Sequence, residues 1–93
     1  MPAATRLGDI SSGHDCFPGR PNVEASGDVF INGLGAHREG DAWDIHSCET
    51  SHDGVLASGS PTVFVNGRPL GRIGDPITCG DVSAQGSPTV FAG

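Results

Sequence analysis

The chain repeats a short pattern three times, and this internal repeat constrains the fold more than any other feature. The tetrapeptide Arg-x-Gly-Asp occurs three times, beginning at Arg6, Arg38 and Arg72, so the copies are 32 and 34 residues apart. An apolar Val-Phe run alternates with it, beginning at Val29, Val63 and Val90. Strands this short are not stable singly. The alternation therefore predicts three related units packed around a pseudo-threefold axis, over residues 5–36, 37–70 and 71–93.

The apolar run at residues 63–65 is followed by a strong hairpin signal. Asn66-Gly67 separates it from a second short run, and Asn32-Gly33 follows the first copy in the same way. A type I′ hairpin turn needs positive φ at both central residues, which Asn and Gly tolerate. No window shows a sustained 3.6-residue period, so we predict no helix. The pattern indicates an all-β fold of short strands and hairpins, in which the third copy ends on its strand.

A chain of this size and composition needs a staple. It has 93 residues, of which 35% are hydrophobic, with 15 Gly and 7 Pro. One domain this small sits near the limit of what burial alone can stabilise. We therefore expect a metal, disulfides or a partner to supply the missing stability.

Charge and hydropathy exclude several classes of protein. The net charge is −6 at pH 7, which argues against a basic nucleic-acid face and against binding to anionic membrane surfaces. No apolar run approaches the 18 or so residues that a transmembrane helix needs. No charged segment followed by an apolar stretch marks a secretory signal. We expect synthesis in the cytoplasm without a signal peptide.

The loops that follow the repeated Asp carry candidate metal ligands. One His or Cys follows each Asp, five residues later in the first two units and four residues later in the third; these are His14, His46 and Cys79. A threefold arrangement brings equivalent positions toward a common axis, and His52, in the same loop as His46, supplies a fourth ligand. Three imidazoles and one thiolate match the tetrahedral set that Zn²⁺ prefers, and iron also accepts these ligand types. We predict a structural metal site at His14, His46, His52 and Cys79.

The two remaining cysteines also occupy equivalent positions. Cys16 and Cys48 each lie seven residues after the repeated Asp. One of them could replace an assigned ligand, or the two could face each other as a disulfide. Three cysteines cannot all pair, and cytoplasmic synthesis favours the reading without a structural disulfide.

Three other residue types have structural rather than catalytic interpretations. His37, which precedes Arg38 outside the loops, is typical of a surface or packing residue. Trp43 is the single Trp and favours a core or interface anchor. The Asp of each Arg-x-Gly-Asp can accept hydrogen bonds from turn amides or pair with an Arg, and its threefold repetition favours an architectural role.

These motifs together resemble the PAAR-repeat family. The resemblance rests on Pro2-Ala3-Ala4-Thr5-Arg6-Leu7-Gly8-Asp9, on the strand and turn over residues 59–67, and on the spaced His and Cys loops. That family forms the sharpened tip of contractile injection machines, which include type VI secretion spikes and contractile phage tails. The resemblance implies a small cone of short β-strands and hairpins with a metal-stapled apex. It also implies zinc as the usual metal, on the four residues assigned above.

The resemblance further implies a mechanical function rather than an enzyme. We expect one PAAR-repeat domain over residues 1–93, without a fused effector domain. Its flat base would cap a trimeric β-helical spike, VgrG or a phage spike, at one copy per trimer, and its point would breach a target membrane. It would then be found at the tip of a phage tail or secretion spike, without a nucleic-acid partner.

Two alternatives to a spike tip remain. One is an adaptor that links effector cargo to the spike. The other is a small zinc hydrolase, which needs an open coordination position and a base. Four protein ligands leave no such position, so the hydrolase is the weaker alternative.

Overall fold

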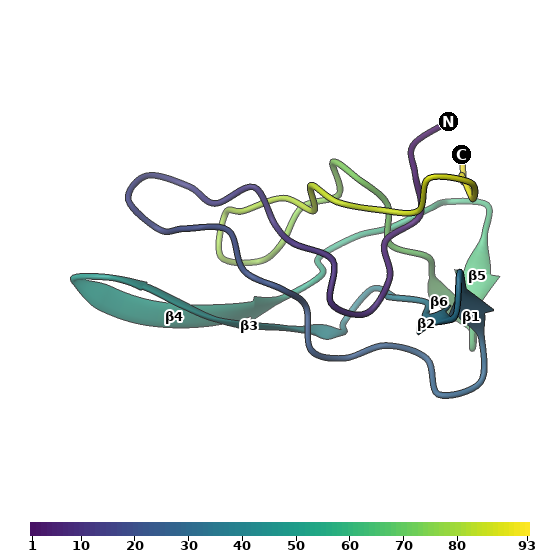
Figure 1. The fold of residues 1–93 in the computed structure, drawn as a ribbon, viewed down its shortest axis with the longest axis horizontal. Helices are drawn as coiled ribbons and strands as arrows, with labels where there is room; N and C mark the ends of the chain where they lie inside the picture. The colour runs from purple at the N-terminus through teal and green to yellow at the C-terminus, as the bar shows by residue number, and fades with distance from the viewer.

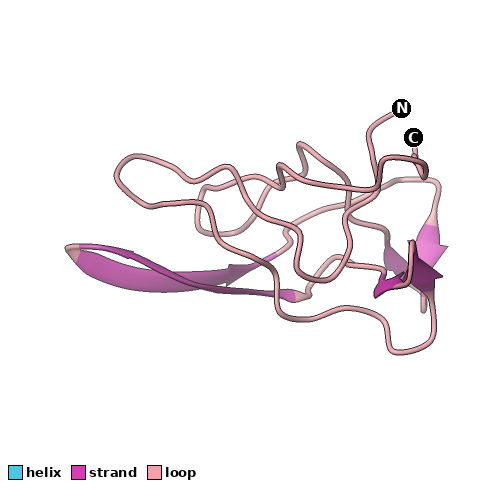
Figure 2. Ribbon diagram, viewed as in Figure 1, coloured by secondary structure: helices cyan, strands magenta, loops and turns pink.

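The computed structural model describes residues 1–93 as six short strands joined by loops (Figures 1 and 2). The strands are β1 (Phe30–Ile31), β2 (Leu34–Gly35), β3 (Ala42–Cys48), β4 (Thr50–Val55), β5 (Phe64–Val65) and β6 (Arg68–Pro69). Each odd-numbered strand pairs antiparallel with the next one, which gives three two-stranded sheets. The predicted all-β fold is confirmed. No helix in it is long and apolar enough to cross a membrane.

The two Asn-Gly pairs form the predicted hairpin turns. φ is 54° at Asn32 and 79° at Gly33, between β1 and β2, and 54° at Asn66 and 76° at Gly67, between β5 and β6. Positive φ at both central residues is the signature of a type I′ turn, whose twist matches that of the paired strands. The turn chemistry of the sequence therefore sets the register of both short sheets.

The third apolar run has no hairpin partner in its own repeat unit and pairs with the N-terminal residues instead. Phe91, in the third apolar run, pairs antiparallel with Ala3, and the backbone N–H of Ala92 donates to the carbonyl of Pro2 over 3.0 Å. Figure 1 shows the two termini beside each other above β1 and β5. The strand on which the third repeat ends thus finds its partner in the N-terminal residues.

A closed ring of backbone hydrogen bonds marks the pseudo-threefold axis. The N–H of Thr5 donates to the carbonyl of Gly71 (2.8 Å), Gly71 donates to His37 (2.8 Å), and His37 donates to Thr5 (3.1 Å). Each of the three residues immediately precedes the Arg of a repeat motif. The predicted pseudo-threefold arrangement is therefore present in the backbone itself.

Each Arg-x-Gly-Asp folds into the same turn. The N–H of the Asp donates to the carbonyl of the Arg, over 3.0, 3.0 and 3.1 Å in the three copies. The intervening glycines, Gly8, Gly40 and Gly74, have φ of 86°, 86° and 91°, as the third position of a type II turn requires. The Asp carboxylate then accepts hydrogen bonds from the backbone and the side chain of its own Arg. The architectural role predicted for these aspartates is confirmed.

The molecule is elongated, and its two ends have different interiors. Its principal extents are 37 × 24 × 21 Å. At the hairpin end, formed by β1, β2, β5, β6 and the chain termini, six apolar residues are buried together: Ala4, Ile31, Ala36, Val65, Leu70 and Ala92. The opposite, loop end consists of residues 10–20, 42–56 and 76–82, and Figure 1 shows β3 and β4 extending into it. Its core has three buried apolar residues, Trp43, Leu56 and Ile77, with Cys79 packed against them.

His37 lies between these two cores. Its side chain is completely buried, its Nδ1 lies 2.8 Å from the carbonyl of Glu24, and its ring meets the Trp43 ring edge-on at 5.0 Å. The sequence left a surface role and a packing role open. The surface role is wrong, because the side chain is buried and the backbone of His37 belongs to the axial ring of hydrogen bonds. His37 is a packing residue.

Candidate metal centre

The β3–β4 hairpin places His46 directly opposite His52. Trp43 and His46 are three positions apart along β3, yet both are buried, with exposed fractions of 2% and 3%. Regular alternation would send them to opposite faces of the strand. The register shifts between these two residues, and a bulge of this kind re-aims the following side chains. The irregularity thus directs His46 into the interior.

A tight turn in the first loop presents His14. The N–H of His14 donates to the carbonyl of Phe17 over 3.0 Å, and the N–H of Phe17 donates back over 2.8 Å. Gly13 has φ of 78°, and a Cβ built on it would lie 2.7 Å from the carbonyl oxygen of Phe17. Only glycine fits there, so the loop can double back and point His14 inward.

The third loop carries Cys79 across β4. The N–H of Gly80 donates to the carbonyl of Ile77 over 2.9 Å, which closes a turn that contains Cys79. The loop lies against Gly54 of β4, where a Cβ would come within 2.9 Å of Ile77 Cγ2. The missing side chain at Gly54 lets the loop approach closely enough to bring Cys79 over the two histidines of the hairpin.

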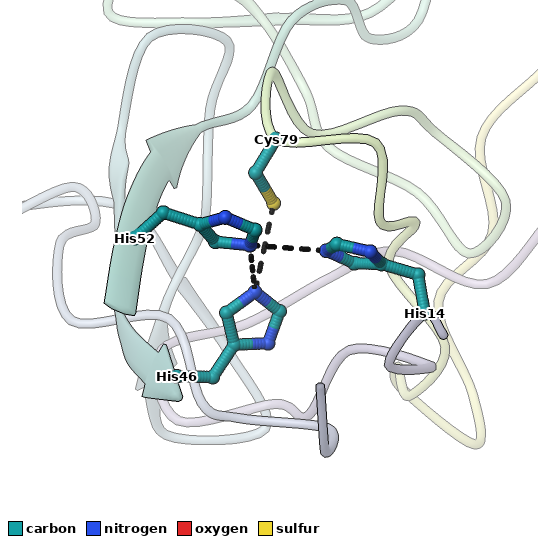
Figure 3. Close-up of side chains that lie close together, drawn as sticks. All are labelled: His14, His46, His52 and Cys79. Atoms are coloured by element: carbon teal, nitrogen blue, oxygen red, sulfur yellow. Dashed lines mark hydrogen bonds between the residues drawn. The ribbon is translucent and has the colours of Figure 1, made fainter. Parts of the chain in front are cut away.

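The structure brings together the four residues selected from the sequence. Figure 3 shows His14, His46, His52 and Cys79 converging; His46 and His52 come from the β3–β4 hairpin, and His14 and Cys79 come from two loops. The Nε2 atoms of His46 and His52 are 2.6 Å apart, those of His14 and His52 are 3.1 Å apart, and Cys79 Sγ lies 3.9 Å from His46 Nε2. All four ligand atoms lie within 4.8 Å of one another. Ligand nitrogens on a tetrahedral zinc ion are about 3.3 Å apart, so small shifts would suit this cluster to a metal ion.

The hydrogen bonding of the imidazoles also suits a cation. His46 Nδ1 lies 2.8 Å from the carbonyl of Pro18, so Nδ1 carries the proton and the Nε2 lone pair points into the cluster. Burial, with the neighbouring His46 and His14, lowers the pKa of His52 and favours its neutral ring. The Nε2 atoms of three imidazoles converge on one point, beside the sulfur of Cys79. The donor set can therefore hold a metal ion.

Phe17 covers the three imidazoles, although no sequence motif selects it. Its ring centroid lies 4.1 Å from that of His52 and 4.9 Å from those of His14 and His46. It follows the first ligand by three residues in a loop rich in Pro and Gly. An aromatic residue in such a loop is the only sequence signal that could have indicated this packing.

Cys16 and Cys48 form a disulfide and are not part of the cluster. Their Cα atoms are 5.7 Å apart, within the usual range for a disulfide. The sequence argument favoured the absence of a structural disulfide, and the structure corrects it. The compartment of synthesis says nothing about how close the fold brings two cysteines. Cys16 lies in the turn after His14 and Cys48 ends β3, so the fold places the equivalent positions side by side and leaves Cys79 free.

A buried ion pair, which the sequence did not predict, lies beside Cys79. Arg20 is 4% exposed, and its Nη1 donates to Asp81 Oδ2 over 2.7 Å. Burial raises the pKa of Asp81, but hydrogen bonds and the charge of Arg20 outweigh that effect, so its pKa lies below the usual value. The two residues are 61 positions apart, and opposite charges in two ligand loops are too weak a signal to predict their pairing.

Comparison with known proteins identifies a family. A family model described as the PAAR motif matches residues 12–85. The chain is also 36% identical over 72 residues to "Double-stranded DNA deaminase toxin A" of Burkholderia cenocepacia (strain H111). The matched region is 74% of this chain but 5% of that relative, so the chain spans only a small part of the relative's length.

Proposed function

Because this chain belongs to the PAAR-motif family, we propose that it is a tip that caps a trimeric β-helical spike of a contractile injection machine. The carrying observation is the pseudo-threefold hairpin end. At this end the β1–β2 hairpin, the β5–β6 hairpin and the pairing of the two chain ends occupy nearly equivalent positions, so one chain offers each subunit of a trimer a similar surface. The expected stoichiometry is therefore one copy per spike trimer.

An exposed apolar ring on the hairpin end supports this docking. Three phenylalanines occupy the same position in the three apolar runs: Phe30, Phe64 and Phe91 have exposed fractions of 60%, 58% and 49%. The preceding valines, Val29, Val63 and Val90, are each 37% exposed. Monomeric proteins rarely expose large apolar patches, and such patches are typical of interaction surfaces. Docking would also cover the open strand edges at the end of a β-helix.

We further propose that the four clustered residues bind one structural Zn²⁺ at the loop end. His14, His46 and His52 would donate Nε2 and Cys79 would donate its thiolate, with iron as the less favoured metal. The ion supplies loop-to-loop cohesion where the apolar core is small, and structural zinc contributes directly to folding free energy. Four protein ligands leave no open position, which disfavours a hydrolase.

The proposed action of the tip is mechanical. The loop end, stapled by the metal and the disulfide, would be the rigid point that meets the target membrane, while the contractile sheath supplies the work. The protein would be made in the cytoplasm and assembled at the tip of a phage tail or secretion spike. No nucleic-acid partner is proposed, in keeping with the net charge of −6.

A second candidate function is a link between effector cargo and the spike. The relative that shares this segment is by name a toxin, and the shared segment is 5% of it. A tip built into a much longer toxin would carry that toxin on the spike. We propose the same linking role for this chain as the alternative to a plain tip.

Stoichiometry and a matched pair of variants test the docking proposal. The chain is mixed with the trimeric spike protein encoded in the same genome, and the complex is weighed by native mass spectrometry; we expect one chain per trimer. Phe64→Asp should weaken binding by about 30-fold or more, as loss of a buried aromatic anchor does. Ile45→Asp is the control, because Ile45 is also 60% exposed but lies at the loop end. A three-to-three complex, or equal affinities for both variants, would overturn the proposal.

A further inference from the structure

Arg20 is a buried charge that the proposed function does not use. Its side chain is 4% exposed, in a part of the loop end where the apolar core is small. A buried guanidinium is costly unless its donors are paired. The partners of Arg20 therefore indicate what it does.

Four contacts fix the guanidinium in place. Nη1 donates to Asp81 Oδ2 over 2.7 Å and also lies 3.4 Å from Ser11 Oγ. Nε donates to the carbonyl of Asp44 over 2.9 Å, and the guanidinium carbon lies 5.7 Å from the centre of the Trp43 ring. These contacts come from all three loops of the loop end.

The remaining nitrogen faces the candidate metal centre. Arg20 Nη2 lies 3.2 Å from Cys79 Sγ, so it donates a hydrogen bond to the sulfur. Asp81, which anchors the guanidinium, accepts hydrogen bonds from Ser12 Oγ (2.7 Å) and from the N–H of Val82 (2.8 Å). A connected chain of hydrogen bonds thus ends on the sulfur.

We propose that Arg20 is a positioning residue that holds Cys79 Sγ toward the three imidazoles and balances the charge of the sulfur when a metal is bound. This inference rests on the metal centre proposed above. A hydrogen bond from a partner outside the ligand set orients the ligand and tunes the metal. Because the other contacts of Arg20 already restrict the guanidinium, little conformational freedom is lost when it contacts the sulfur.

The geometry requires Arg rather than Lys. The planar fork reaches Asp81, the carbonyl of Asp44 and Cys79 at the same time, and its flat face lies near Trp43. A Lys ammonium is a single point of charge and cannot span these partners together. Arg20→Lys should therefore keep the charge but lose the alignment of the sulfur.

Cobalt(II) binding tests the assignment, because a thiolate–cobalt charge-transfer band reports the sulfur directly. Arg20→Met should weaken cobalt and zinc binding about 10- to 100-fold, measured by competition with a chelator, and should shift the band. Arg20→Lys should recover part of the affinity without restoring the band position. The matched control is Arg68→Met, because Arg68 also pairs with an Asp, Asp41, which keeps Arg38 as its other partner, and makes no contact with Cys79. It should leave affinity and band unchanged.

The outcomes separate this inference from the metal proposal. Wild-type protein that binds no cobalt would overturn the metal centre and Arg20's role with it. Wild-type binding together with unchanged affinity and band in Arg20→Met would overturn the role of Arg20 alone. If Arg20→Met does not fold because Asp81 is left unpaired, Arg20→Met with Asp81→Asn removes both charges. Wild-type affinity and band in that double variant would likewise overturn the inference.

Discussion

The hairpin end and the loop end of this molecule solve the same stability problem in different ways. At the hairpin end, short repeated strands bury six apolar residues and close a ring of backbone hydrogen bonds. At the loop end, three buried apolar residues are supplemented by a disulfide, a buried ion pair and a His/Cys cluster. Where the three repeats are alike, backbone hydrogen bonds join them. Where their loops differ, contacts between side chains add the stability that the small apolar core does not supply.

The difference arises from where the sequence keeps its repeat. The Arg-x-Gly-Asp turns fix the start of each loop in the same conformation. Beyond them the loops differ in length and composition, so their apolar residues cannot form a symmetric layer. Equivalent positions still meet near the axis, which is why ligands and cysteines at matching distances from the repeated Asp come together.

Loss of a metal ligand should have the largest effect and should be confined to the loop end. We expect His46→Ala to lower the free energy of unfolding by about 4 kcal/mol or more, because it removes a proposed ligand and the metal's contribution to folding. Thermal unfolding measures the loss, and elemental analysis should find about one metal ion per wild-type chain and none in the variant. A metal-free wild-type protein that is fully folded would contradict the proposal that a metal ion stabilises the fold.

A core change at the opposite end provides the control for this experiment. Leu70→Ala removes a side chain that is 3% exposed in the hairpin-end core and should cost about 2–4 kcal/mol. Its metal content should stay at the wild-type level. Loss of metal in this variant would show that the two ends do not act separately.

The disulfide should contribute slightly less. Replacing Cys16 and Cys48 by Ser opens a loop with a sequence separation of 32. We expect this change to lower stability by about 3–4 kcal/mol on loop-entropy grounds. Because each Cys lies two residues from a proposed ligand, metal release to a chelator should also become faster.

Hydrogen exchange shows which end of the molecule loses stability when the disulfide is removed. Amides of residues 14–17 and 46–52 should exchange faster in the double Ser variant, while β1, β2, β5 and β6 keep their protection. Uniformly faster exchange at both ends would instead mean that the molecule unfolds as a single unit.

The smallest effect concerns pH and His37, which lies between the two ends. Burial lowers the pKa of His37 below its usual 6.5. Below that value the unfolded chain binds a proton that the folded chain does not, so stability is full above about pH 6.5 and falls as the pH decreases toward the lowered pKa. His37→Asn keeps an amide donor near the Glu24 carbonyl but removes the titration. Its unfolding free energy should depend less on pH between about pH 7.5 and about pH 5.5, by at most about 1.4 kcal/mol per pH unit.

The wild type and this variant share the other three histidines, so the difference between their pH profiles isolates His37. Parallel profiles would contradict the assignment of a lowered pKa to this side chain. His37→Asn should also retain its metal, in contrast to His46→Ala.

The sequence predicted those parts of the structure that depend on repetition and local turn chemistry. Asn32-Gly33 and Asn66-Gly67 predicted two hairpins because few residue pairs accept two successive positive φ angles. The distance from each repeated Asp predicted which His and Cys residues converge. Equivalence under a threefold repeat is a geometric statement, so counting residues selected His14, His46 and Cys79; His52 was added because it lies in the same segment as His46.

The features that the sequence did not predict depend on contacts between unlike loops. Arg20 meets Asp81, and Phe17 stacks on His52, across long separations with no periodic pattern between them. The disulfide was judged from the compartment of synthesis, although the same counting that grouped the ligands also made its two cysteines equivalent. The pairing of Phe91 with Ala3 joins the two ends of the chain, which no local motif can signal.

Because Ala3 pairs with Phe91, the two chain ends lie side by side, and a single covalent link between them would close the chain into a ring. Joining the ends by a short linker and reopening the chain at the Asn32-Gly33 turn should preserve the fold, since circular permutation is tolerated where termini are adjacent and the new break is an exposed turn. It also fixes the exit point of any attached polypeptide. A domain joined to either end would leave the molecule beside the pairing of Ala3 with Phe91, at the hairpin end. If that end caps a spike as proposed, such a domain would lie alongside the spike and behind the loop end.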